Sequence, residues 1–580
     1  MSSRRWGHLA ATAKPIARIG TRAVCALGLT VGVVFSVAIP PSQAAPLTLP
    51  GAVQPGRNRP EATLPTQPEV EFRLVTPEKS PVARAIDTVH FHLNDIRIVG
   101  TKVFPAESFR PLFADLVGKD VTLSNVLNVA DGIEARYRAA GYLLVRAYVP
   151  PQRVKDGVFT INVVEGFVEG VSVEGTSERT QDLTKAYLRH AVGQTPLALS
   201  TIERGLLLSN DIPGVTASGT LHAAPSTPGA SDLVVTENAP WVAGGLATDN
   251  RGSRFSGLWT LSADVAFNDL LGGDQLALAG NTSPDGKEQV SGQATYRVAL
   301  GGDGLIGGVF GVYTHGQPGS TLTVAQALTD SWAGGTHFSY PLVRSRALSI
   351  ILQGGLTAQA ATIRTSGLRI SHDEWRVFDI GVTAAKSDFL GASWAGSLDL
   401  AQGLPFLGAT RNGSLSLSRI GAKTDFTKID GSLQAVWPLV ASLSAAAGGS
   451  GQLSFTHLVI GEEVSYGGKL VVRGFDPGSI TGDSGVGGWF ELRDDAHFPA
   501  WQLRTVEPYV FVASADAWFI NGAKFGLPNE SITSIGGGVR VWFPYNVSAD
   551  CEVDRMLNAV AGSDAGHQAT KVLVDAAVNF

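Results

Sequence analysis

The chain has 580 residues, a formal net charge of −6 and 68 glycines. This acidic balance speaks against nucleic acid as a partner, because binding phosphates requires an excess of lysine and arginine. Beyond residue 44 no stretch of about 18 apolar residues occurs, which speaks against an α-helical membrane protein although the mean hydropathy is positive. Hydrophobic residues spread over short alternating segments are instead what the wall of a β-barrel requires.

Residues 1–44 are predicted to be a secretory signal peptide. Five basic residues and no acidic one stand in this segment, an apolar stretch covers 23–39, and Ser42-Gln43-Ala44 provides a cleavage site. The apolar stretch is short for a membrane-spanning helix and is followed by Pro40-Pro41, so a retained transmembrane helix is the weaker alternative. The pair Arg4-Arg5 would also suit a twin-arginine signal, but a barrel precursor is expected to cross the inner membrane unfolded.

Residues 45–86 are rich in proline and charge and are predicted to be an extended or disordered N-terminal linker. The alternative is a short helix near 82–87, which could serve as a plug. Without the signal the chain holds 40 basic and 51 acidic residues, a net charge of about −11. Because Cys25 lies in the signal, Cys551 would have no partner for an intramolecular disulfide bond.

A compact α/β module is predicted over residues 87–166. Ile96 and Ile98 alternate along a strand that stops at Gly100, and two helices are expected to follow it. The second helix is marked by residues at three- and four-residue spacing, namely Leu123, Val126, Leu127, Ala130, Ile133 and Tyr137. Gly141 provides its stop signal. Two strands, over 142–149 and 158–164, complete the predicted module.

A second module is predicted over residues 167–240. The segment 169–175 opens it, and Ser200-Thr201-Ile202-Glu203 has the pattern of a capping box at the start of a helix. The helix carries Leu206, Leu207 and Leu208 and is expected to end before Asn210-Asp211-Ile212-Pro213-Gly214.

Residues 241–580 are predicted to form an antiparallel β-barrel. About 16 segments alternate with period two and are separated by clusters of Gly, Asp, Asn and Pro. Clear examples are 258–267, 275–279, 346–356, 375–384, 431–437 and 534–542. About 340 residues allow roughly 21 for each strand and its turn, and a barrel of that size leaves an aqueous lumen.

Several short motifs resemble those of two-partner secretion outer-membrane transporters of the hemolysin-activator and filamentous-hemagglutinin type. In the first module they are Tyr137, Gly141-Tyr142, Pro150-Pro151-Gln152, Asp156-Gly157 and Val164-Glu165-Gly166, which resemble the polypeptide-transport-associated module, called POTRA. The end of the second-module helix at 210–214 resembles a second POTRA. The last strand-like segment, with Phe580 as its final aromatic, resembles the signal read by the barrel-assembly machinery. The resemblance implies two periplasmic α/β POTRA domains followed by a 16-stranded transmembrane barrel.

The tetrad Val472-Arg473-Gly474-Phe475, followed by Asp476, resembles the VRGF/Y motif of the same family. The resemblance implies a pore loop around 457–487 that folds into the barrel lumen, where the arginine meets acidic groups on the inner wall. An arginine fork on a carboxylate shielded from water would stabilise such a contact by roughly 1.5–3 kcal/mol. The alternative is an ordinary extracellular loop with a salt bridge.

The expected acidic partner of Arg473 is missing from its usual place. The family has the pattern Phe-x-Asp-x-Gly in a downstream strand, but this chain has Ala513 and Ala515 after Phe511. Glu491 is therefore the first candidate partner. The second candidates are Asp494 and Asp516, the latter only if a β-bulge turns it inward, because it follows Ala513 by three residues.

Catalytic, metal and cofactor sites are not expected. Gly482-Asp483-Ser484-Gly485 looks like a protease nucleophile segment, yet such enzymes also need a placed histidine and a buried aspartate. His90 and His92 alternate on one strand and could chelate a metal, although two solvent-facing residues are the simpler interpretation. No nucleotide-binding motif was found, which suits a periplasm that lacks ATP.

These patterns predict a Gram-negative outer-membrane exporter of an unfolded exoprotein. The POTRA modules would capture the exoprotein by its N-terminal secretion domain and the barrel would form the channel. Other expected partners are outer-membrane lipids and, during biogenesis, periplasmic chaperones and the barrel-assembly machinery. The alternatives are an insertion factor for barrel proteins, a passive porin and a surface protease or lipase that would use Ser484.

Overall fold

The computed structural model describes residues 54, 72–74, 90–224, 227–495, 505–558 and 570–580. The predicted signal peptide, the possible plug helix and most of the predicted linker lie outside these residues. Within the described part of the chain, no helix combines the length and the apolar character that a membrane crossing needs.

The first α/β domain contains the predicted strand around Ile96 and Ile98, the helix that begins at Leu123 and the two closing strands, whereas the first predicted helix is a pair of 3-10 helices and an additional strand covers 119–122. Its strands and helices are β2 (His90–Leu93), β3 (Asp95–Val99), the 3-10 helices η2 (Ala106–Leu112) and η3 (Ala114–Leu116), β4 (Lys119–Thr122), α1 (Leu123–Ala139), β5 (Val145–Tyr148) and β6 (Val158–Glu165). The order of the main sheet is β3-β6-β5, in which β3 runs parallel and β5 antiparallel to β6, while β2 pairs with β4. The face of α1 that carries Val126, Ile133 and Tyr137 is buried against this sheet.

The family-like motif residues of this domain bind one another and backbone groups of the same domain. The Tyr137 hydroxyl donates to Glu165 Oε1 at 2.6 Å, and the same oxygen accepts the Lys102 amide at 2.8 Å. Burial and the bond to Glu165 both raise the pKa of Tyr137. The side-chain amide of Gln152 binds both backbone groups of Thr160, donating to its carbonyl at 2.8 Å and accepting from its amide at 2.9 Å. These motif residues therefore stabilise the fold of the domain.

The second α/β domain contains β7 (Phe167–Glu174), α2 (Glu178–Leu188), α3 (Leu199–Asp211), β8 (Thr216–Ala223) and β9 (Ala230–Asn238). The short strand β1 (Phe72–Leu74) pairs in parallel with β8, which gives the sheet order β1-β8-β9-β7. The predicted capping box is wrong. Helix α3 has Ala198 as its N-cap, without a side-chain cap, and the Thr201 amide already binds the Ala198 carbonyl at 3.1 Å, so Ser200 lies inside the first turn.

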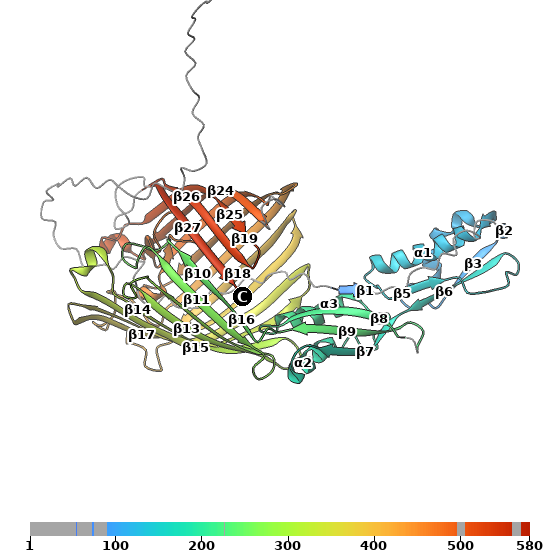
Figure 1. Cartoon of the computed structure of the whole chain (residues 1–580), viewed down its shortest axis with the longest axis horizontal. Helices are drawn as coiled ribbons and strands as arrows, with labels where there is room; N and C mark the ends of the chain where they lie inside the picture. The colour runs from blue at the N-terminus through green and yellow to red at the C-terminus, as the bar shows by residue number, and fades with distance from the viewer. Residues whose placement is uncertain (1–53, 55–71, 75–89, 225–226, 496–504, 559–569) are drawn as a thin grey trace, which may run out of the picture. The chain divides into compact units, whose positions relative to one another are not determined.

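The structure confirms the predicted closed antiparallel barrel of 16 strands. The strands before the long loop are β10 (Val242–Asp249), β11 (Thr260–Asn268), β12 (Asp274–Thr282), β13 (Val290–Leu300), β14 (Leu305–Gly316), β15 (Ala327–Arg344), β16 (Leu348–Thr365), β17 (Leu368–Phe389), β18 (Ala392–Gly403), β19 (Thr427–Val440) and β20 (Leu443–Ser454). The later ones are β23 (Ser484–Asp494), β24 (Thr505–Trp518), β25 (Glu530–Trp542), β26 (Val547–Met556) and β27 (Thr570–Asn579). Short 3-10 turns also occur at η4 (Ser320–Thr323) and η7 (Gly522–Phe525). In Figure 1 the green β10 lies beside the red β27, where the barrel closes.

Strand β24 shows how the alternating sequence builds the wall. Phe511, Ala513 and Ala515 are buried toward the inside of the barrel, whereas Val510 and Val512 are exposed on the outside. Such an outward apolar row is what a lipid-facing surface requires.

The pore loop predicted around 457–487 connects β20 to β23 and covers residues 455–483 in the structure. It contains the 3-10 turn η5 (Ile460–Glu462) and a small hairpin of β21 (Val464–Tyr466) and β22 (Ile480–Gly482). The tetrad at 472–475 lies between the two hairpin strands. The predicted segment therefore overlaps the loop, except that its last residues already belong to β23.

Candidate functional site at the tip of the pore loop

The tip of the pore loop, residues 464–482, has a tightly turned backbone around Arg473. Val472 has φ +57° and Gly474 has φ +89°, both in the left-handed region, which is costly for a β-branched residue. A Cβ placed on Gly474 would lie 2.8 Å from Cβ of Asp554 on β26, closer than real contacts allow. Glycine at this position therefore lets the tip approach the barrel wall.

Arg473 joins the tip to two strands of the wall. Its Nη1 donates to Glu552 Oε2 on β26 at 3.0 Å, and its Nη2 donates to Glu491 Oε2 on β23 at 2.7 Å. The guanidinium lies 3.7 Å from the ring centre of Phe511, which adds a cation–π contact. We call Arg473, Glu491 and Glu552 the tip clamp. It holds the loop against the barrel wall. In that wall β24 and β25 lie between β23 and β26, the two strands that carry the clamp acids.

The two acids of the tip clamp also bind other donors. Glu491 accepts two hydrogen bonds from Arg540, each at 3.0 Å. Glu552 accepts from Arg251 at 2.9 Å and from the Tyr509 hydroxyl at 2.6 Å. Each carboxylate thus keeps charged or polar partners when Arg473 leaves, which lowers the cost of opening the clamp.

Apolar side chains pack the tip beside the clamp. Val472 and Phe475 are buried in one cluster with Phe511, Ala513 and Ala515 of β24. In this chain the two alanines stand where the family pattern has Asp and Gly. They contribute small apolar surface to a packed contact, so the charge that receives Arg473 comes from neighbouring strands.

Further ion pairs lie around the tip. Asp476, which follows the tetrad, pairs with Lys571 of β27, and Lys469 pairs with Asp575 at 2.9 Å with a largely exposed side chain. The exposed pair is expected to contribute little to stability.

The structure brings Arg473 and Glu491 together but places Asp494 and Asp516 elsewhere. The β23–β24 ladder is continuous and has no bulge at Asp516, which therefore lies on the exposed face of β24. Asp494 follows Glu491 by three residues, hence on the other face of β23. Among the described residues, no hydrogen bond or ion pair joins either aspartate to Arg473.

Sequence reasoning missed Glu552. Its signal was present, because Asp550, Glu552 and Asp554 stand at alternate positions of β26 and so share one face. Three acids in a row on one face of a strand are costly unless cations meet them. Arg251, which also belongs to this network, lies in the loop after β10 and carries no comparable sequence signal.

Ser484 and His92, which the sequence suggested as candidates for catalysis and metal binding, form contacts with other groups. Ser484 Oγ accepts the Ser454 amide at 3.0 Å. His92 pairs with Asp120 at 3.1 Å on an exposed surface. Across the described ranges, no group of three His, Cys, Asp or Glu residues has the arrangement of a metal site.

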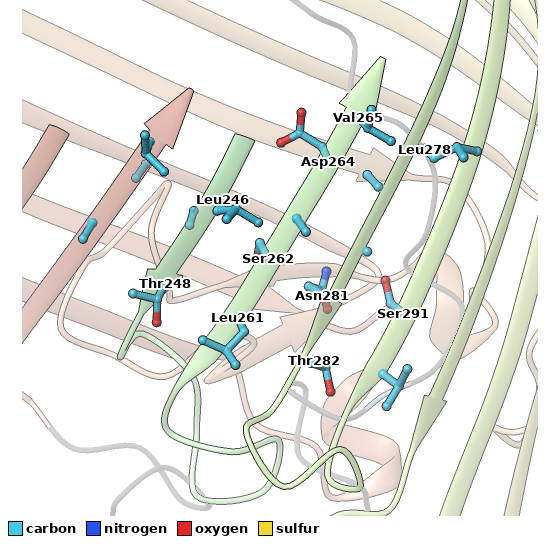
Figure 2. A pocket seen from close by; sticks show the side chains of 18 of the residues that line it. Leu246, Thr248, Leu261, Ser262, Asp264, Val265, Leu278, Asn281, Thr282 and Ser291 are labelled. Carbon is cyan, nitrogen blue, oxygen red and sulfur yellow. The ribbon is translucent and has the colours of Figure 1, made fainter. Parts of the chain in front are cut away.

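A separate hollow runs along β10 to β13 and the adjoining β27. Figure 2 shows Leu246, Leu261 and Leu278 on neighbouring strands of this hollow, with Asp264 nearby. Asp264 is the one charged residue among the described residues that line it.

Two family matches cover most of the barrel and the first domain. Residues 229–516 match the family described as haemolysin secretion/activation protein ShlB/FhaC/HecB, and residues 91–166 match the ShlB-type POTRA domain. The first of these spans reaches from β9 into β24 and includes the whole pore loop.

Curated relatives are remote in sequence. The heme/hemopexin transporter protein HuxB of Haemophilus influenzae strain 86-028NP is 25% identical over 48% of this chain and 52% of its own length. The chain thus spans about half the length of that relative. The outer membrane transporter CdiB of Dickeya dadantii is 23% identical over 77% of this chain and 79% of its own length.

Solved structures show the same fold. CdiB from Escherichia coli aligns with a TM-score of 0.65 at 20% identity, covering 87% of this chain and 93% of that one. BamA from Haemophilus ducreyi lacking POTRA domains 1–3 aligns with a TM-score of 0.53 at 15% identity, covering 84% of this chain and 100% of that one. With these matches beside the closed barrel, the chain belongs to the ShlB/FhaC/HecB family of haemolysin secretion/activation proteins, and its first α/β domain is a POTRA domain of the ShlB type.

Proposed function

We propose that this protein exports an unfolded exoprotein across the outer membrane by two-partner secretion. The observation that carries the proposal is that the family match over 229–516, which includes the pore loop and Arg473, lies in a chain whose closed barrel holds the Arg473 clamp. The printed names of the relatives HuxB and CdiB also describe transporters. The partner would be an exoprotein with an N-terminal secretion domain.

The proposed placement puts the barrel in the outer membrane and both α/β domains in the periplasm. The exposed apolar rows of the barrel, such as Val510 and Val512, suit contact with lipid. We assign the second α/β domain as a further POTRA domain, because its two helices and sheet share the layered α/β build of the first. An extended substrate would bind by adding a strand to a sheet edge, as β1 already does at β8. Chaperones and the barrel-assembly machinery would act during biogenesis.

In the proposed mechanism the tip clamp closes the lumen at rest and opens during export. Release of Arg473 leaves Glu491 with Arg540, and Glu552 with Arg251 and Tyr509, so no clamp acid is left buried without a partner. The tip is therefore held by a contact that is specific but can be broken at modest cost. No cofactor takes part in this step.

The test first asks whether a gene for a large exoprotein with an N-terminal secretion domain neighbours the gene of this chain, and then measures export of that exoprotein. Cells carrying Arg473→Ala are expected to retain the exoprotein, while the level and the heat-modifiable gel mobility of the barrel stay unchanged. Arg411→Ala, which removes an exposed arginine in the loop between β18 and β19, is the control and is expected to export normally. Normal export by Arg473→Ala would remove the role assigned to the clamp.

A second candidate function is insertion of barrel proteins into the outer membrane. The likeness to BamA in fold favours it, although at 15% identity that likeness concerns the fold alone. Depleting this chain separates the two: loss of one exoprotein from the medium supports secretion, whereas a general loss of outer-membrane barrels supports insertion. Passive uptake of small solutes with neither loss would indicate a porin.

A further inference from the structure

The pore loop is also held where it enters and leaves the barrel lumen. We call residues 457–463 and Asp483 the neck of the loop, and residues 404–426, between β18 and β19, the outer loop. Asp483 is fully buried and lies immediately before β23. The neck is thus a region of the pore loop separate from the tip at 464–482.

Asp483 joins both limbs of the neck to two other loops. Arg419 of the outer loop donates to its two carboxylate oxygens at 2.7 and 2.9 Å, a two-pronged contact. The Leu458 amide, on the limb that enters the lumen, donates at 2.8 Å, and the Ile520 amide, from the loop after β24, donates at 2.9 Å. Four hydrogen bonds from three segments therefore converge on one carboxylate.

Arg419 is itself closely held. Its Nη1 also donates to Glu463 at 3.1 Å, and its guanidinium lies 4.3 Å from the ring centre of Phe519. Burial alone would lower the pKa of Arg419, but the contacts with Asp483 and Glu463 outweigh it and raise that pKa. The arginine is therefore a permanently charged partner for the neck.

Other contacts fix the neck to the barrel wall. Glu462 accepts from Trp375 Nε1 at 2.8 Å and pairs with Lys428 at 3.0 Å. A buried apolar cluster packs beside it, made of Ala361, Trp375, Val377, Ala401, Ala422, Phe426, Leu458 and Val459. This cluster takes residues from the neck, the outer loop and the wall, so moving the neck would expose apolar surface as well as charge.

We propose that Arg419 and Asp483 are positioning residues that fix the neck as the pivot of the pore loop. Only the tip at 464–482 then moves when the tip clamp opens, and the neck stays on the outer loop. This inference rests on the proposed export function, because it concerns which part of the pore loop moves during transport.

The first experiment measures distances between nitroxide labels on the purified full chain in lipid. Labels are placed on the exposed residues Leu398 of the wall, Leu470 of the tip and Ile420 of the outer loop, after both native cysteines are replaced by Cys25→Ser and Cys551→Ser. Arg473→Ala is expected to broaden the 398–470 distance and leave 398–420 narrow. Arg419→Ala is expected to broaden 398–420. Broadening of both distances to the same extent by Arg473→Ala would mean that the loop moves as one body and would overturn the proposal.

The second experiment records conductance in planar lipid bilayers, where no exoprotein is needed. Arg419→Ala should raise the fraction of time in large open states by roughly tenfold, the change expected from one lost charge-assisted contact. Arg419→Lys should recover much of the closed state because it keeps the charge, and Arg411→Ala should match the parent. Equal behaviour of Arg419→Ala and Arg411→Ala would refute the pivot.

A second variant and readouts that are independent of secretion allow the test to be decided in every case. If Arg419→Ala does not give a folded barrel by gel mobility, Asp483→Asn keeps the shape of the side chain while removing its charge and should broaden the same 398–420 distance. Because neither readout involves secretion, a failed pivot and a failed export function are distinguishable.

Discussion

The tip and the neck of the pore loop are each held by an arginine that binds carboxylates. The two sites differ in which other donors those carboxylates have. At the tip, Glu491 and Glu552 each keep further donors besides Arg473. At the neck, Asp483 receives two of its hydrogen bonds from Arg419 alone and is fully buried. At the tip, a cationic donor remains on each acid when Arg473 leaves, which makes the contact reversible. At the neck, loss of Arg419 would leave the buried Asp483 with two backbone amides and with His457 at 3.5 Å, which makes the neck contact more expensive to break.

The largest effect on stability is expected at the neck. Asp483→Ala would leave two backbone amides without their acceptor and the Arg419 guanidinium with Glu463 as its remaining carboxylate partner, which should cost about 3–5 kcal/mol. Thermal unfolding in detergent measures the loss, as a lower Tm. The matched control is Asp425→Ala in the outer loop, where the carboxylate accepts a bond from the exposed Asn412. Equal effects of the two substitutions would contradict the special position of Asp483.

Arg473→Ala should cost less stability, about 1–2 kcal/mol, because both clamp acids retain donors. Its effect on bilayer conductance should nevertheless be strong, since the tip is then free. A loss of Tm as large as that of Asp483→Ala would erase the distinction between tip and neck.

Gly474→Ala tests the tip through its backbone. The added methyl group would meet Cβ of Asp554 at 2.8 Å and sit at φ +89°, so we expect a loss of about 1–3 kcal/mol and more frequent channel opening. Gly413→Ala is the matched control, because Gly413 also has positive φ, at +80°, but has open space around its Cβ position. The difference between the two variants isolates the contact with the wall, and no difference would show that this contact is unimportant.

The smallest effect is expected from Lys469→Ala. The side chain of Lys469 is largely exposed and its pair with Asp575 should contribute about 0.2–1 kcal/mol at low salt. Unfolding measured at low and high salt checks this, since screening should abolish the difference. A loss that persists at high salt would indicate that the tip is held more firmly than its exposed contacts suggest.

Local patterns predicted the architecture well. Period-two alternation located the barrel strands, and the spacing of Val126, Ile133 and Tyr137 located helix α1 with its buried face. The capping box failed because a Ser-x-x-Glu pattern does not say whether the helix has already begun at the preceding residue, as it does here at Leu199. Periodicity reports which face is buried more reliably than where an element starts.

The candidate site was predictable only in part. The motif singled out Arg473 and Glu491 was the first candidate partner, but the choice of Glu552 depends on how β26 is staggered against β23 around the barrel. Arg419 and Asp483 belong to two loops that only the folded barrel brings together. The local sequence around either residue does not predict the other as its partner. Long-range pairing of this kind is set by closure of the whole sheet.

The closure itself has a consequence for how the wall is sealed. The ladder between β10 and β27 runs only from Gly245–Asn579 to Asp249–Asp575, extended by mutual backbone bonds of Gly244 and Phe580, whereas β10 pairs with β11 along its entire length. The wall of a barrel is closed only when every pair of neighbouring strands is hydrogen-bonded. Because this short ladder joins the first and last strands of the barrel, its loss would turn the closed wall into a curled sheet with an open side.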